Sequence, residues 1–227
     1  MTTARVPLVL ASASPARLAT LRSAGIEPVV IVSGVDEDQV SGLPPAELAL
    51  QLAELKCAAV AARDDVPPDA LVLGCDSVLE LQPAPPGSHG HGEALGKPRD
   101  ADEARERWRS MRGRTAVLHS GHSLREVATG RVAAATGSTL VHFADVGDDE
   151  IEAYVATGEP LHVAGAFTVD SLGGAFIERV DGDPSTVVGM SMSTLRRLVR
   201  ELGVEWTALW NTTDPSLGTT ETDPVTL

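Results

Sequence analysis

Short apolar runs alternate with amphipathic stretches along this chain, and the alternation limits the available folds more than any other feature. Apolar runs bounded by turn residues are typical of buried strands, and apolar residues at helical spacing are typical of surface helices. Their alternation favours an α/β layer architecture over a helical bundle or a β-sandwich. We expect strands at 6–11, 28–35, 71–81, 115–124, 131–143 and 164–169. We expect helices from Pro15 to Gly25 and at 45–63, 100–112, 148–157 and 193–202.

Composition narrows the class of protein further. The chain has 227 residues, 43% of them apolar, and a formal net charge of −14, values that fit one compact domain. The sequence has no run near the ~18 apolar residues of a membrane-spanning helix, so we expect a cytoplasmic protein with no membrane partner. An acidic chain repels nucleic-acid phosphates, which excludes a nucleic-acid polymer as partner. Two cysteines, Cys57 and Cys75, are too few for a disulfide framework.

Lysine is rare in this chain, which has 16 arginines and two lysines, Lys56 and Lys97. Where arginine supplies nearly all the cations, each lysine becomes a candidate for a task that suits a compact ammonium group. Chance is the alternative explanation. Lys56 is expected at the edge of the apolar stripe of the 45–63 helix, and Lys97 follows a predicted loop.

A turn of small residues, Ser12 to Arg17, separates the first predicted strand from the first helix. Ser14 can cap that helix, whose free N–H groups and positive dipole end favour an anion. Arg17 adds a fork of donors suited to phosphate oxygens. The same residues also make an ordinary helix start, and the glycine-rich signatures of common nucleotide-binding loops are absent from the sequence.

Asp76 stands in the middle of the most apolar predicted strand, 71–81. A buried, unpaired carboxylate costs several kcal/mol, so a cation must compensate it, in a structural ion pair or in an active site. Glu37 is a second acid at a predicted strand end. Together these acids and the cations predict a cleft for phosphates and a divalent metal, with cations at Arg17, Lys56 and Lys97.

Three further segments have expected roles. The glycine-rich block at 159–176 predicts tight turns, and within it His162 is expected to be a structural hydrogen-bonding residue. His89 and His91 lie in a proline- and glycine-rich segment that we expect to be an exposed loop. After about Asn211 the sequence has few apolar residues, which predicts a disordered tail at 211–227 beyond a domain at 1–210.

These segments follow one another in an order that resembles a known family, the Maf family of nucleoside triphosphate pyrophosphatases. The order is L-A-S-A-S-P-A-R, G-V-D-E, L-A-E-L-K-C-A, G-C-D-S-V, L-G-K-P-R-D, E-P-L-H-V-A-G-A-F-T-V-D-S-L-G-G and V-D-G-D-P-S-T-V-V-G. The resemblance runs from about Val6 to Leu202. It implies a Maf/ITPase-like fold, in which two lobes surround a twisted mixed sheet and a central cleft. It also implies hydrolysis of a nucleoside triphosphate to a monophosphate and pyrophosphate with Mg²⁺ or Mn²⁺.

The resemblance also implies roles for individual residues. Asp76 would accept the proton of the attacking water, and Glu37 would help Asp76 to hold the metal. The cations that match the family's catalytic and phosphate-binding positions are Arg17, Lys56 and Lys97. The serines of the small-residue turn, Ser12 and Ser14, would contact the substrate. The predicted partner is therefore a nucleotide from the cellular pool, and the number of chains in the assembly, including a homodimer, is left open.

The chain departs from the family pattern at positions linked to the choice of base. Ala16 stands where the family motif has a second arginine, and Ser77 and Asp170 stand where the branch for dTTP and UTP has Thr and Gln. An ionised Asp can only accept hydrogen bonds, so Asp170 suits a base edge rich in donors, such as guanine. A branch acting on 7-methyl-GTP also has an acid there, but it differs at Ala16 and Ser77. The base therefore stays open, and Ala16 leaves room for a broad range.

Two other classes of function compete with this prediction. A regulator of cell division could bind a nucleotide without hydrolysing it, but simple binding needs no general base such as Asp76. An enzyme acting on phosphorylated sugars or other pyrophosphates would hydrolyse substrates regardless of the base.

Overall fold

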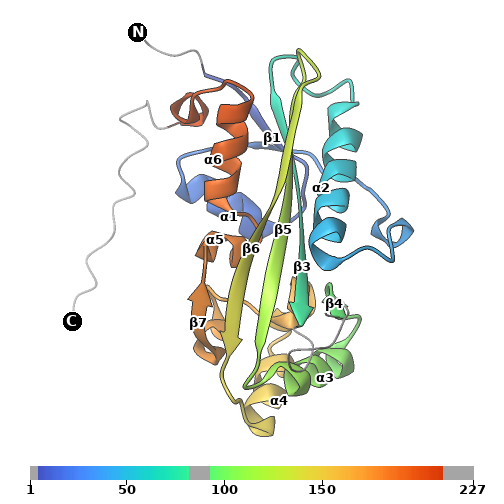
Figure 1. Ribbon diagram of the computed structural model, residues 1–227, viewed down its shortest axis with the longest axis vertical. Helices are drawn as coiled ribbons and strands as arrows, with labels where there is room; N and C mark the ends of the chain where they lie inside the picture. The colour runs from blue at the N-terminus through green and yellow to red at the C-terminus, as the bar shows by residue number, and fades with distance from the viewer. Residues whose placement is uncertain (1–4, 82–92, 212–227) are drawn as a thin grey trace, which may run out of the picture.

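A long mixed β-sheet forms the frame of the computed structural model, which describes residues 5–81 and 93–211 (Figure 1). Within these residues the seven strands of the sheet run in the order β2-β1-β3-β5-β6-β7, with β4 paired to β3. The strands are β1 (Leu8–Leu10), β2 (Val29–Val30), β3 (Leu71–Leu81), β4 (Glu93–Leu95), β5 (Thr115–Glu126), β6 (Val132–Phe143) and β7 (Ile177–Asp181). β1 pairs in parallel with β2 and β3, and the remaining pairs are antiparallel.

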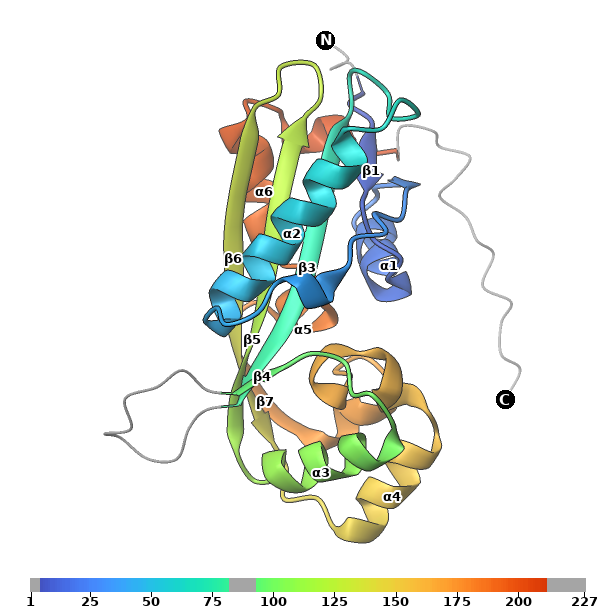
Figure 2. The same ribbon diagram turned by 90° about the vertical axis from the view of Figure 1, so that its right-hand side faces the viewer.

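Helices cover the sheet differently at its two ends (Figures 1 and 2). At one end α2 covers one face, while α1 and α6 cover the other; at the far end α3 and α4 form a second lobe. The helices are α1 (Pro15–Ser23), α2 (Pro45–Ala61), α3 (Ala101–Met111), α4 (Asp148–Ala156), α5 (Pro184–Val188) and α6 (Met192–Glu201). None of the helices in the described ranges has the length and apolar character needed to cross a bilayer. The expected α/β fold of two lobes around a mixed sheet is confirmed.

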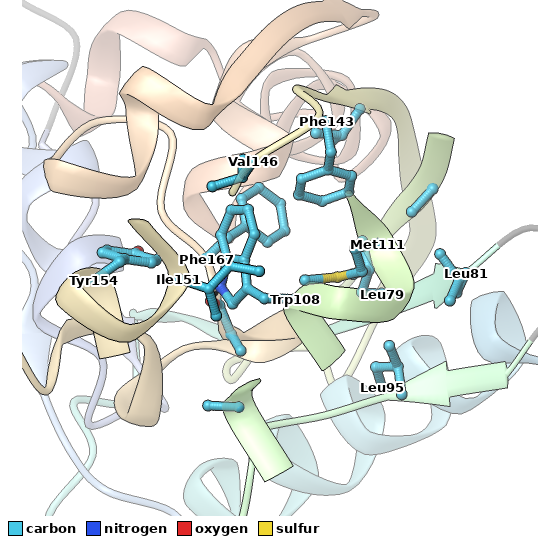
Figure 3. Packing of buried hydrophobic residues seen from close by; sticks show 14 of the residues in the cluster. Leu79, Leu81, Leu95, Trp108, Met111, Phe143, Val146, Ile151, Tyr154 and Phe167 are labelled. Carbon is cyan, nitrogen blue, oxygen red and sulfur yellow. Dashed lines mark hydrogen bonds between the residues drawn. The ribbon is translucent and has the colours of Figure 1, made fainter. Parts of the chain in front are cut away.

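Each lobe has its own apolar core. In the lobe of α3 and α4, Trp108 is fully buried and meets Phe143 and Tyr154 edge to face (Figure 3). Its indole Nε1–H donates to the carbonyl oxygen of Ala166 at 2.8 Å, which satisfies the polar atom of a buried aromatic ring. The long strands β3, β5 and β6 pass through both lobes and therefore hold them together.

One edge of β3 is open between the two lobes. β1 pairs with Leu71–Leu73, and β4 pairs with Leu79–Leu81. Between these partners, within the described residues, no strand covers the edge of β3 at 74–78, although β5 pairs along its other edge. Side chains from both faces of β3 can therefore reach the space beside this edge, and Asp76 lies at its centre.

Two glycines let α2 lie directly on the sheet. A Cβ on Gly74 would lie 2.1 Å from the carbonyl oxygen of Ala53, and one on Gly121 would lie 2.1 Å from that of Ala49. The buried face of α2 accordingly carries small residues, and Lys56 is in that face. The prediction that Lys56 lies at the edge of the apolar stripe is therefore wrong, because of the three leucines at helical spacing only Leu52 is buried, and small residues make up most of the buried side.

Several predicted elements differ in the structure. The strand expected at 28–35 is reduced to Val29–Val30, and the chain leaves the sheet after the Ile31 N–H donates to the carbonyl oxygen of Leu10. The strand expected at 164–169 is wrong: Ala164–Ala166 is a 3₁₀ turn in which Gly165 has a φ of 72° and packs against Leu79. The sequence patterns did not predict β4, β7 or α5.

Two predicted segments fall almost wholly outside the described residues. They are the exposed loop at 82–93, with His89 and His91, and the tail at 211–227. Both stay predictions, as does the boundary between the domain and the tail.

We expect Gly74→Ala to destabilise the protein by about 2 kcal/mol or more, because its methyl group would collide with the backbone of α2. That loss lowers the unfolding temperature by roughly 4 °C or more, measurable by circular dichroism. Gly96→Ala is the matched control, since its Cβ would meet nothing within 4 Å. An equal effect of both substitutions would contradict the close packing of α2.

Candidate active site

A cleft of about 820 Å³ opens between the lobes beside the open edge of β3. It collects residues from segments far apart in the sequence: the turn before α1, the chain after β2, the buried face of α2, β3 and the loop after β4. Its lining includes every predicted catalytic and metal-binding residue, namely Arg17, Glu37, Lys56, Asp76 and Lys97, together with Ser12, Ser14 and Ala16. The fold therefore brings the predicted cluster together.

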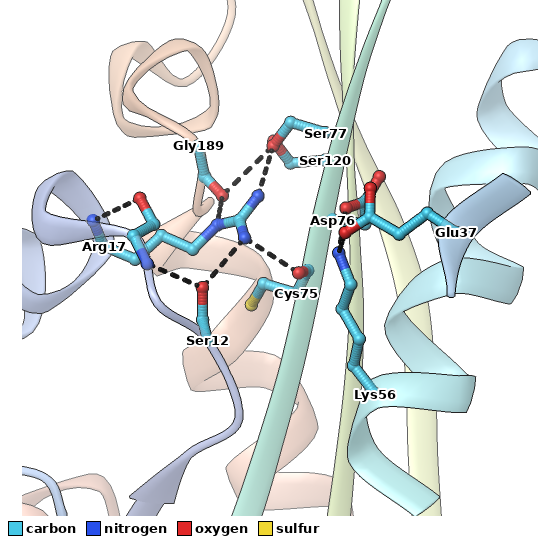
Figure 4. A network of polar contacts seen from close by, with 10 residues as sticks. Ser12, Arg17, Glu37, Lys56, Cys75, Asp76, Ser77, Ser120 and Gly189 are labelled. Carbon is cyan, nitrogen blue, oxygen red and sulfur yellow. Dashed lines mark hydrogen bonds and ion pairs between the residues drawn. The ribbon is translucent and has the colours of Figure 1, made fainter. Parts of the chain in front are cut away.

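Asp76 is paired with Lys56 at the inner wall of the cleft (Figure 4). The Lys56 Nζ lies 2.5 Å from Asp76 Oδ1 and 2.6 Å from Glu37 Oε1. Lys56 and Asp76 are both buried, whereas the Glu37 side chain is 55% exposed. Burial raises the pKa of Asp76 above its usual value, while the charges of Lys56 and Arg17 act against that rise. The result is a carboxylate with increased proton affinity.

Arg17 lies across β3 from Lys56 and binds mainly to the protein (Figure 4). Its Nε donates to the carbonyl oxygen of Gly189 at 2.9 Å, and its Nη1 donates to Ser12 Oγ and to the carbonyl oxygen of Cys75. Its Nη2 donates to Ser77 Oγ at 3.1 Å. Four of the five guanidinium N–H groups thus donate hydrogen bonds. One of them donates to the carbonyl oxygen of Cys75, which lies in the part of β3 that no strand pairs along this edge.

The turn before α1 has the geometry predicted from its small residues. Ser14 caps α1 by accepting from the backbone N–H of Arg17 at 3.4 Å, and the Ser14 N–H donates to Ser12 Oγ at 3.2 Å. The positive end of the helix dipole therefore faces the cleft, where it favours negative charge.

Lys97 is the free cation of the cleft. Its side chain is exposed and makes no ion pair among the residues the structure describes. The loop that carries it is held by Arg107 on α3, which donates to the carbonyl oxygens of Gly96 at 2.5 Å and of Lys97 at 3.4 Å. The ammonium group is therefore available to a ligand, on a backbone that α3 fixes in place.

A smaller pocket of about 120 Å³ continues from the cleft on the other face of β3. Ser77, Asp170 and the chain before Gly189 line it, together with Leu118 and Phe167. The hydroxyl of Ser77 is occupied by Arg17, Ser120 and the carbonyl oxygen of Gly189. Asp170 is exposed and has no hydrogen-bond partner within residues 5–81 and 93–211. Of these two predicted substrate contacts, Asp170 is the one free to bind a ligand.

Glu159 organises the loop that carries Asp170, and sequence reasoning assigned it no role. Its carboxylate accepts hydrogen bonds from the side chains of Tyr154, Thr168 and Ser171 and from the backbone N–H groups of Leu172 and Gly173. These bonds outweigh its partial burial and hold its pKa at about 2. The only sequence signal was an acid at the first position of the glycine-rich block at 159–176.

His162 does not have the structural role expected from the sequence. It is exposed, lines both the cleft and the smaller pocket, and makes no hydrogen bond to other described residues. Its imidazole therefore faces the space a ligand would enter.

The acids of the cleft supply only some of the ligands that a divalent metal needs. No group of three or more metal-binding side chains gathers anywhere in the described part of the chain. Asp76 and Glu37 nevertheless contact the same ammonium nitrogen, so their carboxylates lie close together. Mg²⁺ is usually held by one or two carboxylates and completed by phosphate oxygens and water. The donor set therefore fits Mg²⁺ or Mn²⁺ arriving with a phosphate ligand.

Comparison with known proteins agrees with this chemistry. Residues 7–202 match the family described as Maf-like protein. A nucleoside triphosphate pyrophosphatase of Streptomyces avermitilis is 57% identical over 203 residues, covering 89% of this chain and 94% of that protein. A nucleoside triphosphate pyrophosphatase of Salinispora tropica is 56% identical over 220 residues, covering 95% and 93%. The Ham1 protein of Staphylococcus aureus is a distant likeness, with a TM-score of 0.38 and 16% identity over 61% of this chain and 72% of that one.

We expect Lys56→Met to raise the pKa of Asp76 further, because the substitution removes the ammonium group that stabilises its carboxylate. Titration of the Asp76 carboxyl carbon by NMR measures this shift. Lys97→Met removes a cation that makes no ion pair with Asp76, and it is the matched control with a smaller effect. An unchanged or lowered pKa in Lys56→Met would contradict the pairing.

We expect Glu159→Gln to lower the free energy of unfolding at pH 7, because the neutral amide loses charge-assisted hydrogen bonds. The folded-state pKa of Glu159 is depressed to about 2, so its contribution is complete above the ordinary pKa of 4.5 and is lost as the pH falls toward 2. Urea unfolding at pH 7 and pH 3 measures the difference between variant and wild type, which should shrink at pH 3. Glu178→Gln on exposed β7 is the control, and a difference independent of pH would contradict this role.

Proposed function

The chain belongs to the Maf-like protein family, and we propose that it hydrolyses a nucleoside triphosphate between the α and β phosphates, releasing a nucleoside monophosphate and pyrophosphate. It is thus a hydrolase of the nucleoside triphosphate pyrophosphatase class. The observation that best supports the proposed site is the Lys56–Asp76 ion pair at the open edge of β3, with Glu37 beside it. A general base, cations and a metal-binding acid meet there in one cleft.

The two connected spaces suit the two parts of such a substrate. The larger cleft holds Lys56, Lys97 and the N-terminus of α1, all of which favour phosphate oxygens. The smaller pocket is lined by apolar residues and the carboxylate of Asp170, and it suits a base. Asp76 lines both spaces, so the α phosphate, which joins nucleoside to triphosphate, falls beside it.

Asp76 acts as the general base in this proposal. Its carboxylate takes a proton from a water molecule whose oxygen forms the new bond to the α phosphorus, while the bond from that phosphorus to the bridging oxygen breaks. Pyrophosphate leaves with the electron pair, and Lys56 and Lys97 offset the charge that develops on it. The raised pKa of Asp76 makes it a stronger base than an exposed aspartate.

Arg17 serves the site mainly by positioning. Its bonds to the backbone of Cys75 and Gly189 connect the α1 turn, β3 and the end of α5, and one N–H remains for a phosphate oxygen. Its charge nevertheless adds to the positive potential in the cleft.

A divalent metal completes the proposed site. Glu37 and Asp76 would hold Mg²⁺ or Mn²⁺, and such an ion polarises phosphoryl oxygens and neutralises part of the triphosphate charge.

Asp170 and Ala16 set the proposed choice of base. Asp170 offers acceptors only, which favours a donor-rich edge such as that of guanine, and Ala16 leaves space beside it. That space is consistent with a broad range that includes modified nucleotides, and with the role in clearing such nucleotides from the pool that the resemblance to the Maf family implies.

The test of this function is pyrophosphate release from a panel of nucleoside triphosphates with Mg²⁺ or Mn²⁺, beside an Asp76→Asn control. We expect activity on a subset of the panel and its loss in the control. Binding without release, in wild type and control alike, would instead support a nucleotide-sensing regulator of cell division.

We expect Lys56→Ala and Lys97→Ala each to lower the turnover number at least tenfold, equivalent to about 1.4 kcal/mol of transition-state stabilisation. Both lysines line the cleft beside Asp76, and neither alanine can offset phosphate charge. Steady-state pyrophosphate release measures the effect. Unchanged rates in either variant would refute the role assigned to that lysine.

We expect Asp170→Gln to move the preference toward pyrimidine nucleotides, because an amide both donates and accepts hydrogen bonds. The ratio of kcat/KM for UTP to that for GTP measures the shift. An unaltered ratio would remove Asp170 from base selection.

A further inference from the structure

A second groove, of about 590 Å³, lies beside the pocket assigned to the base. It runs between α1 and the segment from α5 to the start of α6, elements that lie next to one another in Figure 1. Three residues line both the groove and the base pocket: Ala16, Asp170 and Val188. The two spaces therefore adjoin at these residues, and we call the second one the outer groove.

We propose that the outer groove is a subsite for a substituent on the nucleobase, and that it favours substituents that donate hydrogen bonds or carry positive charge. This inference rests on the proposed function, since it takes the smaller pocket to hold the base. It adds a substrate class, namely nucleoside triphosphates whose base carries an extended chain.

The junction between the two spaces has room for such a chain. The side chain of Ala16 ends at its Cβ, and Ala19 one turn later also ends there, so neither reaches across the groove. Met192 and Val188 on the opposite wall provide apolar contact for methylene groups. At about 590 Å³ the groove is larger than the base pocket itself, so it can take a chain of several atoms.

Asp170, Thr20 and Ser185 offer acceptors in the groove, whereas Ser23, the fourth polar side chain of the lining, lies about two helical turns along α1 from Ala16. Asp170 carries a negative charge and has no partner among the described residues. Thr20 Oγ1 already donates to the carbonyl oxygen of Ala16 at 2.9 Å, and Ser185 Oγ donates to Asp183 at 2.6 Å. Both hydroxyl hydrogens are therefore already donated within the protein, and the two hydroxyl oxygens can only accept a hydrogen bond from a ligand. An ammonium or amide N–H is matched to this lining, whereas a carboxylate is repelled by Asp170.

The first experiment compares substituted with unsubstituted nucleotides on the wild-type enzyme. The probes are UTP with 5-(3-aminoallyl)-UTP, and ATP with N6-(6-aminohexyl)-ATP, each beside a carboxyalkyl derivative of similar length. We take whichever parent nucleotide, UTP or ATP, the enzyme hydrolyses faster. For that pair, we expect kcat/KM of the aminoalkyl nucleotide to equal or exceed that of its parent. The carboxyalkyl form should be at least tenfold slower than the aminoalkyl form. A failure to hydrolyse either the aminoalkyl or the carboxyalkyl form, with the parent nucleotide hydrolysed, would overturn the proposal of a subsite.

The second experiment fills the groove with Ala19→Trp. Ala19 is exposed on α1 and lines the outer groove but neither the cleft nor the base pocket. We expect at least a tenfold loss of kcat/KM for the aminoalkyl nucleotide and less than a twofold change for its parent. Ala58→Trp, at an exposed alanine of α2, is the matched control and should change neither.

The outcomes separate this inference from the function it rests on. Equal loss for both nucleotides in Ala19→Trp, or no loss for either, would overturn the subsite while leaving hydrolysis of the parent nucleotide intact in wild type. Failure of the wild-type enzyme to hydrolyse any nucleotide of the triphosphate panel would overturn the proposed function and the subsite with it.

Discussion

The ion pair between Lys56 and Asp76 is the interaction on which the site depends. A carboxylate in the middle of an apolar strand is costly unless a cation lies against it, and α2 delivers that cation at 2.5 Å. This approach needs α2 to lie on the backbone of the sheet, and Gly74 and Gly121 make the required space. The close packing of one helix therefore stabilises Asp76 in its buried position, and the cation that the helix delivers opposes the rise in the Asp76 pKa that burial causes.

The open edge of β3 explains why the site is where it is. A strand paired along both edges would direct Asp76 and Ser77 to opposite faces of a closed sheet, but here β1 ends before them and β4 begins after them. Both side chains thus line one continuous space between the lobes. Arg17 donates to the carbonyl of Cys75, which has no strand partner at this edge, and connects it to the turn before α1, so the opening is held by side chains instead of a neighbouring strand.

Much of this arrangement could be predicted from sequence because its causes are local. The long apolar run of β3, the cap of α1 and the rarity of lysine identified Asp76, Ser14, Lys56 and Lys97. Other features depend on contacts between segments that are separated in the sequence. Lys56 lies within the buried face of α2 because glycines on β3 and β5 let the helix approach the sheet. Glu159 fixes the following loop by accepting hydrogen bonds from residues such as Ser171, twelve positions later in the chain. The strand expected at 164–169 failed because Gly165 needs a positive φ to pack against Leu79, which apolar periodicity does not report.

A crystal structure with Mg²⁺ and the α,β-methylene analogue of the preferred nucleotide tests the central claim most directly, because that analogue cannot be cleaved at the proposed bond. We expect the α phosphate beside Asp76, the outer phosphates against Lys97 and the N-terminus of α1, and the base in the pocket lined by Asp170. Phosphates bound away from this cleft, for example at the exposed arginines Arg196, Arg197 and Arg200 of α6, would contradict it.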